Sequence, residues 1–122
     1  MIIPYGKQDI NQDDIDSVVE VLKSDFLTQG SKIPLFEKNL SEYCGVKYAK
    51  TVNNGTAALH LSILAVGVKK NDIVWVPSNT FVATANAAMY CGAKIEFVDI
   101  DARTYNISIE CLLKKLIDAK NN

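Results

Sequence analysis

The first third of the chain carries apolar residues at helical spacing. Ile15, Val18, Val19 and Leu22 lie three or four positions apart, which is the period of a helix with one apolar face. Asn11 precedes this run, and an asparagine in that place commonly caps a helix by accepting hydrogen bonds from its first backbone N–H groups. The pattern therefore predicts an amphipathic helix that begins after Asn11.

A second helix is predicted between Ser31, as its N-terminal cap, and Gly45, as the residue that ends it. The side chains expected on its buried side are Leu35, Phe36, Leu40 and Tyr43. Residues 25–30 lie between the two helices and are predicted to form a loop. Residues 1–47 are therefore interpreted as an N-terminal helical segment with an intervening loop.

From residue 48 onwards, short extended runs alternate with helical ones. The expected elements are, in order, an extended run over 48–52, a helix over 56–66, an extended run over 73–76, a helix over 81–90, an extended run over 94–100 and a helix over 109–119. Gly67 and Gly92 are expected to end the first two of these helices, and Ser108 to cap the third. The alternation predicts parallel strands with helices on both faces of the sheet. The fold class is therefore α/β.

Composition narrows the classes of function. The chain has 13 Lys and Arg residues against 14 Asp and Glu residues, a formal net charge of −1, and no basic cluster longer than a pair. This balance gives no electrostatic reason to expect nucleic acid or an anionic membrane as a partner. No segment approaches about 18 uninterrupted apolar residues, and the first residues lack the pattern of a signal peptide. The sequence therefore predicts a cytoplasmic protein.

Cysteine and acidic residues do not suggest a metal site. Cys44, Cys91 and Cys111 are odd in number and show no Cys-x-x-Cys spacing, so we expect reduced core thiols rather than disulfides, metal ligands or nucleophiles. Asp99 and Asp101 follow a predicted strand, but two carboxylates without a third ligand are too few for a metal ion. They are interpreted as a strand end and a turn.

The most informative stretch runs from Asn53 to His60, where an extended run changes into an apolar helix through a Gly-Thr step. Gly55 lets the backbone turn tightly and lets a ligand approach closely. The unpaired N–H groups of Thr56 and Ala57 would open a helix whose positive dipole end favours an anion. The alternative is a plain strand-to-helix turn with a cap. His60, the only histidine, is expected to be a structural or partly exposed residue rather than a catalytic base.

A second strand end runs into a helix at residues 76–87, and Phe81 stands one residue into that helix. In parallel α/β sheets the ligand crevice lies beyond the carboxyl ends of the strands. The turns at residues 54–56 and 79–81 are therefore expected to meet at one edge of the sheet. The Phe81 ring could stack on a flat ligand there, and the alternative is a core phenylalanine under the sheet edge.

These two segments, with residues 25–30 before them and 97–101 after them, resemble the DegT/StrS family of pyridoxal-phosphate-dependent sugar aminotransferases. The resemblance runs from Ile3 to about Ile117. It implies N-terminal helices followed by part of the mostly parallel-sheet large domain of a fold type I aminotransferase. Residues 48–122 would then be a truncated part of the cofactor-binding α/β domain.

The resemblance also implies ligands and site residues. Thr56 and Ala57 match the pair that binds the phosphate of pyridoxal 5'-phosphate in the family, and Phe81 matches the aromatic residue that stacks on the cofactor ring. The positions that match substrate contacts are Tyr5, Asp25, Phe26, Leu27, Thr28 and Gly55. For Tyr5 the alternative is that it packs a frayed terminus.

Within the family, residues 3–10 and 103–106 look most like the transaminases of pseudaminic acid biosynthesis. The implied substrates are a nucleotide-linked 4-keto-6-deoxy sugar, aminated at C4, and an amino donor such as glutamate. The family resemblance also implies a homodimer with the active site at the subunit interface.

Catalysis in that family needs a lysine that bonds the cofactor aldehyde, and an acid that protonates the pyridine nitrogen. No lysine of this chain occupies the matching position, so no catalytic residue is assigned and we expect this segment to be inactive alone. The alternatives are a non-catalytic sugar-nucleotide-binding or partner-binding module, and an unstable product whose uncovered apolar faces lead to aggregation.

Overall fold

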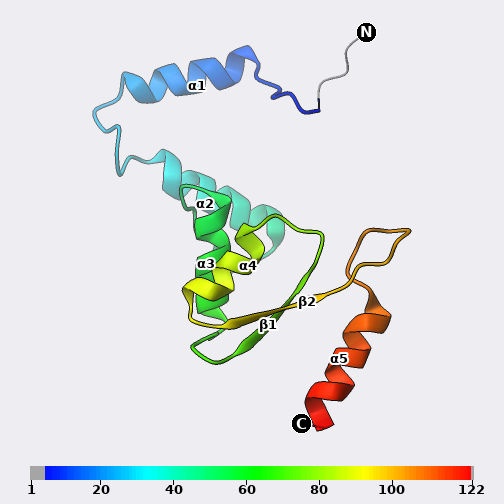
Figure 1. Ribbon diagram of the computed structural model, residues 1–122. Helices are drawn as coiled ribbons and strands as arrows, with labels where there is room; N and C mark the ends of the chain where they lie inside the picture. Colours follow the sequence, from blue (N-terminus) through cyan, green and yellow to red (C-terminus); the bar gives the residue numbers. More distant parts are fainter. Residues whose placement is uncertain (1–4, 122) are drawn as a thin grey trace. The chain divides into compact units, whose positions relative to one another are not determined.

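The computed structural model describes residues 5–121, and these residues contain five helices and two strands. They form two compact units, of which the first ends at Thr51 and the second begins at Val52. Their elements, coloured along the chain in Figure 1, are α1 (Gln12–Leu22) and α2 (Lys32–Cys44) in the first unit, and α3 (Gly55–Ala65), β1 (Ile73–Pro77), α4 (Ala83–Tyr90), β2 (Lys94–Val98) and α5 (Ile109–Asn121) in the second. The predicted functional division at residues 47 and 48 remains a prediction.

Helix α1 begins where the sequence predicts. The Asn11 side chain accepts hydrogen bonds from the backbone N–H groups of Asp13 and Asp14, at 2.8 and 3.2 Å. The Asp14 carboxylate in turn accepts from the backbone N–H of Asn11, at 3.0 Å. This reciprocal pair is a capping box, which satisfies donors that a helix start leaves without intrahelical partners.

Helix α2 also has the predicted bounds, but the predicted cap is wrong. Ser31 already has helical backbone angles, with φ −70° and ψ −17°, and its side chain makes no capping hydrogen bond. A capping side chain reaches the first turn from an extended backbone, so the helical conformation of Ser31 removes that geometry. At the other end Gly45 is left-handed, with φ 64°, as expected for the residue that ends a helix.

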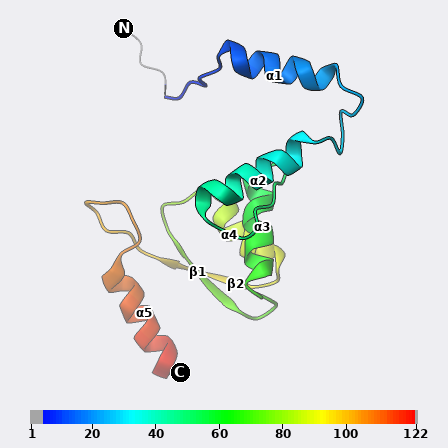
Figure 2. The same ribbon diagram turned by 180° about the vertical axis from the view of Figure 1, so that it is seen from behind.

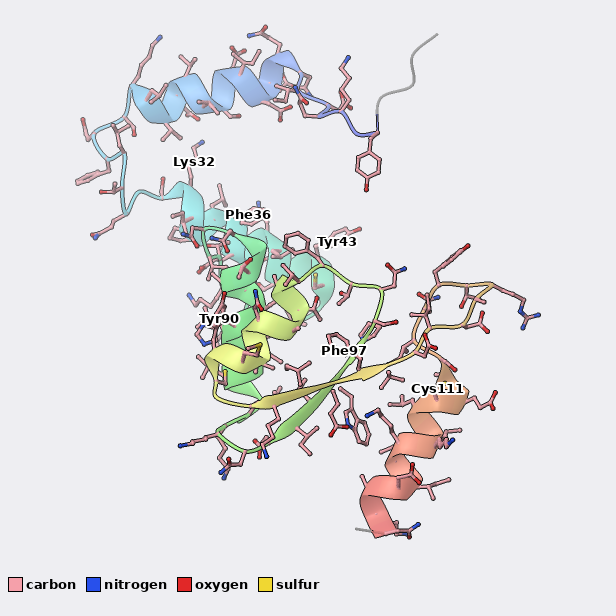
Figure 3. The ribbon with its side chains drawn as sticks, in the orientation of Figure 1. Lys32, Phe36, Tyr43, Tyr90, Phe97 and Cys111 are labelled. Carbon is pink, nitrogen blue, oxygen red and sulfur yellow. The ribbon has the colours of Figure 1, made fainter. Side chains whose placement is uncertain are left out.

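The expected buried side of α2 is exposed. Phe36 and Tyr43, labelled in Figure 3, are 57% and 91% exposed, and Leu35 and Leu40 are exposed as well. Neither α1 nor α2 contains a buried residue. The apolar pattern of a helix specifies which face can be buried, but burial needs a second element on that face. The prediction of a buried side is therefore wrong for the residues that the structure describes.

The second unit is built on a parallel pair of strands. β1 and β2 pair in register from Ile73 opposite Lys94 to Pro77 opposite Val98, which confirms the expected parallel pairing. Helices α3 and α4 lie on one side of this pair and α5 on the other (Figures 1 and 2). The buried apolar residues are small, and they are Val76, Ala83, Ala87, Ala88, Ala93 and Val98. Three of them are alanines of α4, which therefore approaches the strands closely.

The extended run predicted over 48–52 is not a strand. A strand requires ladder hydrogen bonds to a neighbouring strand, and in the described residues this run has none. Instead the backbone N–H of Thr51 donates to the Glu37 carboxylate at 3.0 Å, and the Lys50 ammonium donates to its other oxygen at 2.8 Å. These donors, Lys50 first, lower the pKa of Glu37 below its ordinary value. The predicted strand over 94–100 likewise ends earlier, at Val98.

Helix α5 is capped by Ser108, whose hydroxyl accepts from the backbone N–H of Cys111 at 3.2 Å, as predicted. One carboxylate connects α5 to both strands. Glu96 Oε2 accepts from the Lys115 ammonium at 2.6 Å and from the Trp75 indole N–H at 3.1 Å. The hydrogen bond from Lys115, followed by that from Trp75, lowers the pKa of Glu96. Phe97, on β2, is 59% exposed, so the strands are not covered on both faces along their whole length as predicted.

All three cysteines are free thiols. Cys91 and Cys111 are half-buried, but Cys44 is exposed, so the expectation of a core position is wrong for that residue. Asp101 forms a turn, because its carboxylate accepts from the backbone N–H groups of Thr104 and Arg103, at 2.9 and 3.0 Å. Among residues 5–121, no group of three histidine, cysteine or acidic side chains is placed to hold a metal ion. No helix of that range has the length and apolar character needed to span a membrane.

Candidate functional site

Asn54 organises the start of α3. Its backbone is extended, with φ −163° and ψ 167°, and its side-chain oxygen accepts from the backbone N–H of Ala57 at 2.8 Å. The side-chain amide also donates to Asn53 Oδ1, at 3.1 Å. The helix thus begins at Gly55, one residue earlier than predicted, and the prediction of an unpaired Ala57 N–H is wrong. The signal was present in the sequence, because asparagine is among the preferred capping residues.

The backbone angles at residue 55 do not require a glycine. Its φ is not positive, so any residue could adopt the backbone, and the expected role in a tight turn is wrong. A Cβ atom built at Gly55 would have no heavy atom within 4 Å. The space over Gly55 is therefore open, as the approach of a ligand requires.

A cavity of about 470 Å³ opens beside this helix start. Gly55 and Thr56 of α3 line it together with Phe81, which precedes α4. The other residues that line it are Ala58, Leu59, Ser62 and Ala83. The two turns predicted to meet therefore do meet. Phe81 is 76% exposed, which excludes the alternative of a core phenylalanine, whereas Ala57 does not line the cavity.

The chemistry of this cavity suits a phosphate joined to a flat ring. None of the seven residues that line it is charged, so an anion there would be held by backbone N–H groups, the Thr56 hydroxyl and the positive end of the α3 dipole. In the described chain the backbone N–H of Thr56 has no hydrogen-bond partner. Phe81 adds an exposed aromatic face on which a planar ring can stack.

The first unit contains a separate cavity of about 550 Å³. Of the predicted substrate loop, Asp25, Phe26 and Leu27 line it, and Thr28 does not. Glu20 and Lys32 also line it and form an ion pair at 2.6 Å, and the hydrogen bond from Lys32 lowers the pKa of Glu20. Both residues were missed at the sequence level, since a single Glu and a single Lys twelve positions apart carry no recognisable pattern.

Two further predicted residues lie outside both cavities. Tyr5 is fully exposed and lines neither of them. His60 is half-buried, and its ring meets the ring of Tyr90 from α4 edge to face, with 5.4 Å between centroids. An edge-to-face pair is a packing contact, as expected for a structural histidine. Tyr90 is labelled at the end of α4 in Figure 3.

A parallel strand pair, a helix start with a free N–H group and an exposed aromatic ring beside one cavity are typical of the ligand-binding edge of an α/β protein. Comparison with known proteins identifies the family. The chain belongs to the DegT/DnrJ/EryC1/StrS aminotransferase family, whose model matches residues 8–121. The resemblance found in the sequence is thereby confirmed.

Two curated proteins of the family are similar to this chain. The chain is 48% identical, over 81% of its length, to a UDP-4-amino-4,6-dideoxy-N-acetyl-beta-L-altrosamine transaminase from Campylobacter jejuni. It is 46% identical, over 75% of its length, to a GDP-perosamine synthase from Caulobacter vibrioides. The chain covers only 26% and 25% of these two proteins. It therefore spans about a quarter of the length of the curated relatives that it matches.

Solved structures confirm the fold. A putative sugar aminotransferase from Streptococcus pneumoniae in its pyridoxal phosphate form is 33% identical and superposes with a TM-score of 0.85, over 92% of this chain and 29% of that one. Its pyridoxamine phosphate and apo forms give TM-scores of 0.84 and 0.85. The chain has the fold of part of a fold type I aminotransferase, and its backbone is equally similar to the empty and the loaded forms.

Proposed function

We propose that this chain is the amino-terminal part of a cytoplasmic pyridoxal-phosphate-dependent aminotransferase that aminates C4 of a nucleotide-linked 4-keto-6-deoxy sugar. The implied pathway is amino-sugar synthesis of the pseudaminic acid type, with glutamate as amino donor and a homodimer as the working form. The observation that carries the proposal is the cavity in which Thr56, at the start of α3, and the exposed Phe81 lie together. The names of the two relatives support the substrate class.

Each residue of the cavity has a role in this proposal. The Thr56 N–H and hydroxyl, with the Ala57 N–H, bind the cofactor phosphate. Gly55 leaves the space over the helix start open to the ligand, and Phe81 stacks on the pyridine ring and fixes its plane. When bound, the cofactor acts as an electron sink at the carbon that carries the nitrogen. This part of the chain binds and orients the cofactor.

Substrate recognition is assigned to the first unit. Asp25, Phe26 and Leu27 line its cavity, and we propose that they contact the nucleotide sugar together with Thr28 and Tyr5. Gly55, in the second unit, is proposed as a separate substrate contact. Proton transfer needs a lysine and an acid beside the cofactor, and no lysine or acid lines the cavity of the second unit. We therefore propose that residues 1–122 alone bind the cofactor but do not transaminate.

The test compares two exposed phenylalanines. Phe81→Leu should weaken binding of pyridoxal phosphate about tenfold. The stacking of a flat heterocycle, such as a nucleobase, on an aromatic side chain contributes about 1–3 kcal/mol. Phe97→Leu, on β2 and outside the cavity, is the matched control and should leave the affinity unchanged. Binding is followed by the absorbance of the cofactor and by NMR shifts at the Thr56 amide. Equal affinities for both variants, or turnover of a nucleotide-linked keto sugar by residues 1–122 with glutamate, would contradict the proposal.

A further inference from the structure

The cap of α3 competes with the anion that the site is proposed to bind. The backbone N–H of Ala57 is one of the three donors assigned to the cofactor phosphate, and it already donates to the Asn54 side chain at 2.8 Å. An N–H group makes one good hydrogen bond at a time. A phosphate and the side-chain oxygen of Asn54 therefore cannot both accept the hydrogen bond of the Ala57 N–H.

Rotation of the Asn54 side chain can resolve the competition without a change of fold. The chain superposes equally well on the pyridoxal phosphate form and the apo form of the Streptococcus pneumoniae aminotransferase, with a TM-score of 0.85 for each. The overall fold is thus similar to both forms, and rotation of the Asn54 side chain alone would free the Ala57 N–H. Asn54 is exposed, so its side chain can rotate at the cost of its hydrogen bonds with Ala57 and Asn53.

We infer that Asn54 is a displaceable cap, which closes the Ala57 N–H in the empty site and rotates away when a phosphate binds. The inference rests on the proposed function and adds a residue that sets the affinity for the cofactor. The side chain stabilises the empty helix start, and that stabilisation is lost on loading. Asn54 thus lowers phosphate affinity while it protects the site from fraying before the cofactor arrives.

The free energy of a helix cap sets the size of the effect. Replacing a capping asparagine by alanine typically costs a helix an amount equivalent to about a fivefold change in an equilibrium constant. Asn54→Ala should therefore bind inorganic phosphate and pyridoxal phosphate about fivefold more tightly and unfold at a lower temperature. Asn54→Asp keeps a stronger, charged acceptor, so it should retain the melting temperature and bind both ligands at least tenfold more weakly.

Asn11→Ala is the matched control, because Asn11 caps α1 in the same way as Asn54 caps α3. Its own side-chain oxygen accepts a hydrogen bond of 2.8 Å from the backbone N–H of Asp13. It should lower helix stability and leave phosphate affinity unchanged. Hydrogen exchange at the Ala57 amide gives a readout that does not depend on activity. Exchange should be slow in the free wild type, fast in free Asn54→Ala, and slow again in both once phosphate is bound.

The outcomes separate this inference from the function on which it rests. If the wild type binds pyridoxal phosphate but Asn54→Ala binds it equally or more weakly, the displaceable cap is wrong and the cofactor site stands. If neither protein shows a phosphate-dependent shift at Thr56 or Ala57, the proposed function fails and the inference fails with it. Tighter binding by Asn54→Ala, with the control unchanged, supports both.

Discussion

Gly55→Ala separates a glycine required by the fold from one required by a ligand. The φ angle of Gly55 lies outside the left-handed region, and a Cβ atom there has no heavy atom within 4 Å. Alanine is therefore tolerated without strain, and it restricts the unfolded chain more than glycine does. The expected gain in the free energy of unfolding is about 0.4–1 kcal/mol, which corresponds to a rise of a few degrees in melting temperature for a unit of this size.

Binding should change in the opposite direction. The added methyl group points into the open space over the helix start, where the ligand is proposed to lie, so affinity for pyridoxal phosphate should fall about tenfold or more. Thermal unfolding followed by circular dichroism gives the stability, and titration with the cofactor gives the affinity. A variant that is less stable than the wild type, or that binds equally well, would refute the reasoning.

Gly67→Ala is the control for this prediction, because Gly67 ends the same helix and a Cβ atom there also has open space around it. It differs in its φ angle of 83°, which costs an L-residue about 1–2 kcal/mol. Gly67→Ala should therefore destabilise the unit and leave cofactor affinity unchanged. The two glycines of one helix should thus respond with opposite signs in stability.

Two other substitutions test the packing and electrostatics of the second unit. Ala87 has no exposed surface, so Ala87→Leu overpacks the buried side of α4 and should lower the free energy of unfolding in urea by about 1–3 kcal/mol. Glu96 has a pKa lowered by Lys115 and Trp75, so it favours the folded state when ionised, and this contribution disappears as the pH falls through the acid range. Glu96→Gln should remove that part of the pH dependence, and identical urea midpoints against pH for wild type and variant would contradict the assignment.

The sequence by itself determined the elements and the family. Periodicity, capping residues and helix-ending glycines placed the five helices of residues 5–121 to within a few residues, because these are local properties of the chain. The Gly-Thr step and Phe81 marked the residues that line the cavity of the second unit, since the ends of parallel strands and the helix starts that follow them meet at one edge of a sheet. The extended character of residues 48–52 was also a local property, but a strand needs a neighbouring strand. In the described chain the backbone N–H of Thr51 donates to the Glu37 carboxylate instead.

Tertiary structure alone decided how the site is completed. That Gly55 and Phe81 share one cavity depends on the packing of α3 against α4, which no local pattern specifies. Asn54 can cap the Ala57 N–H because its backbone is extended, with φ −163° and ψ 167°, whereas Ser31 is helical, with φ −70° and ψ −17°, and does not cap. The sequence pattern predicts the apolar faces of α1 and α2. Burial of such a face also needs a second element packed on it, which the pattern of one helix does not specify.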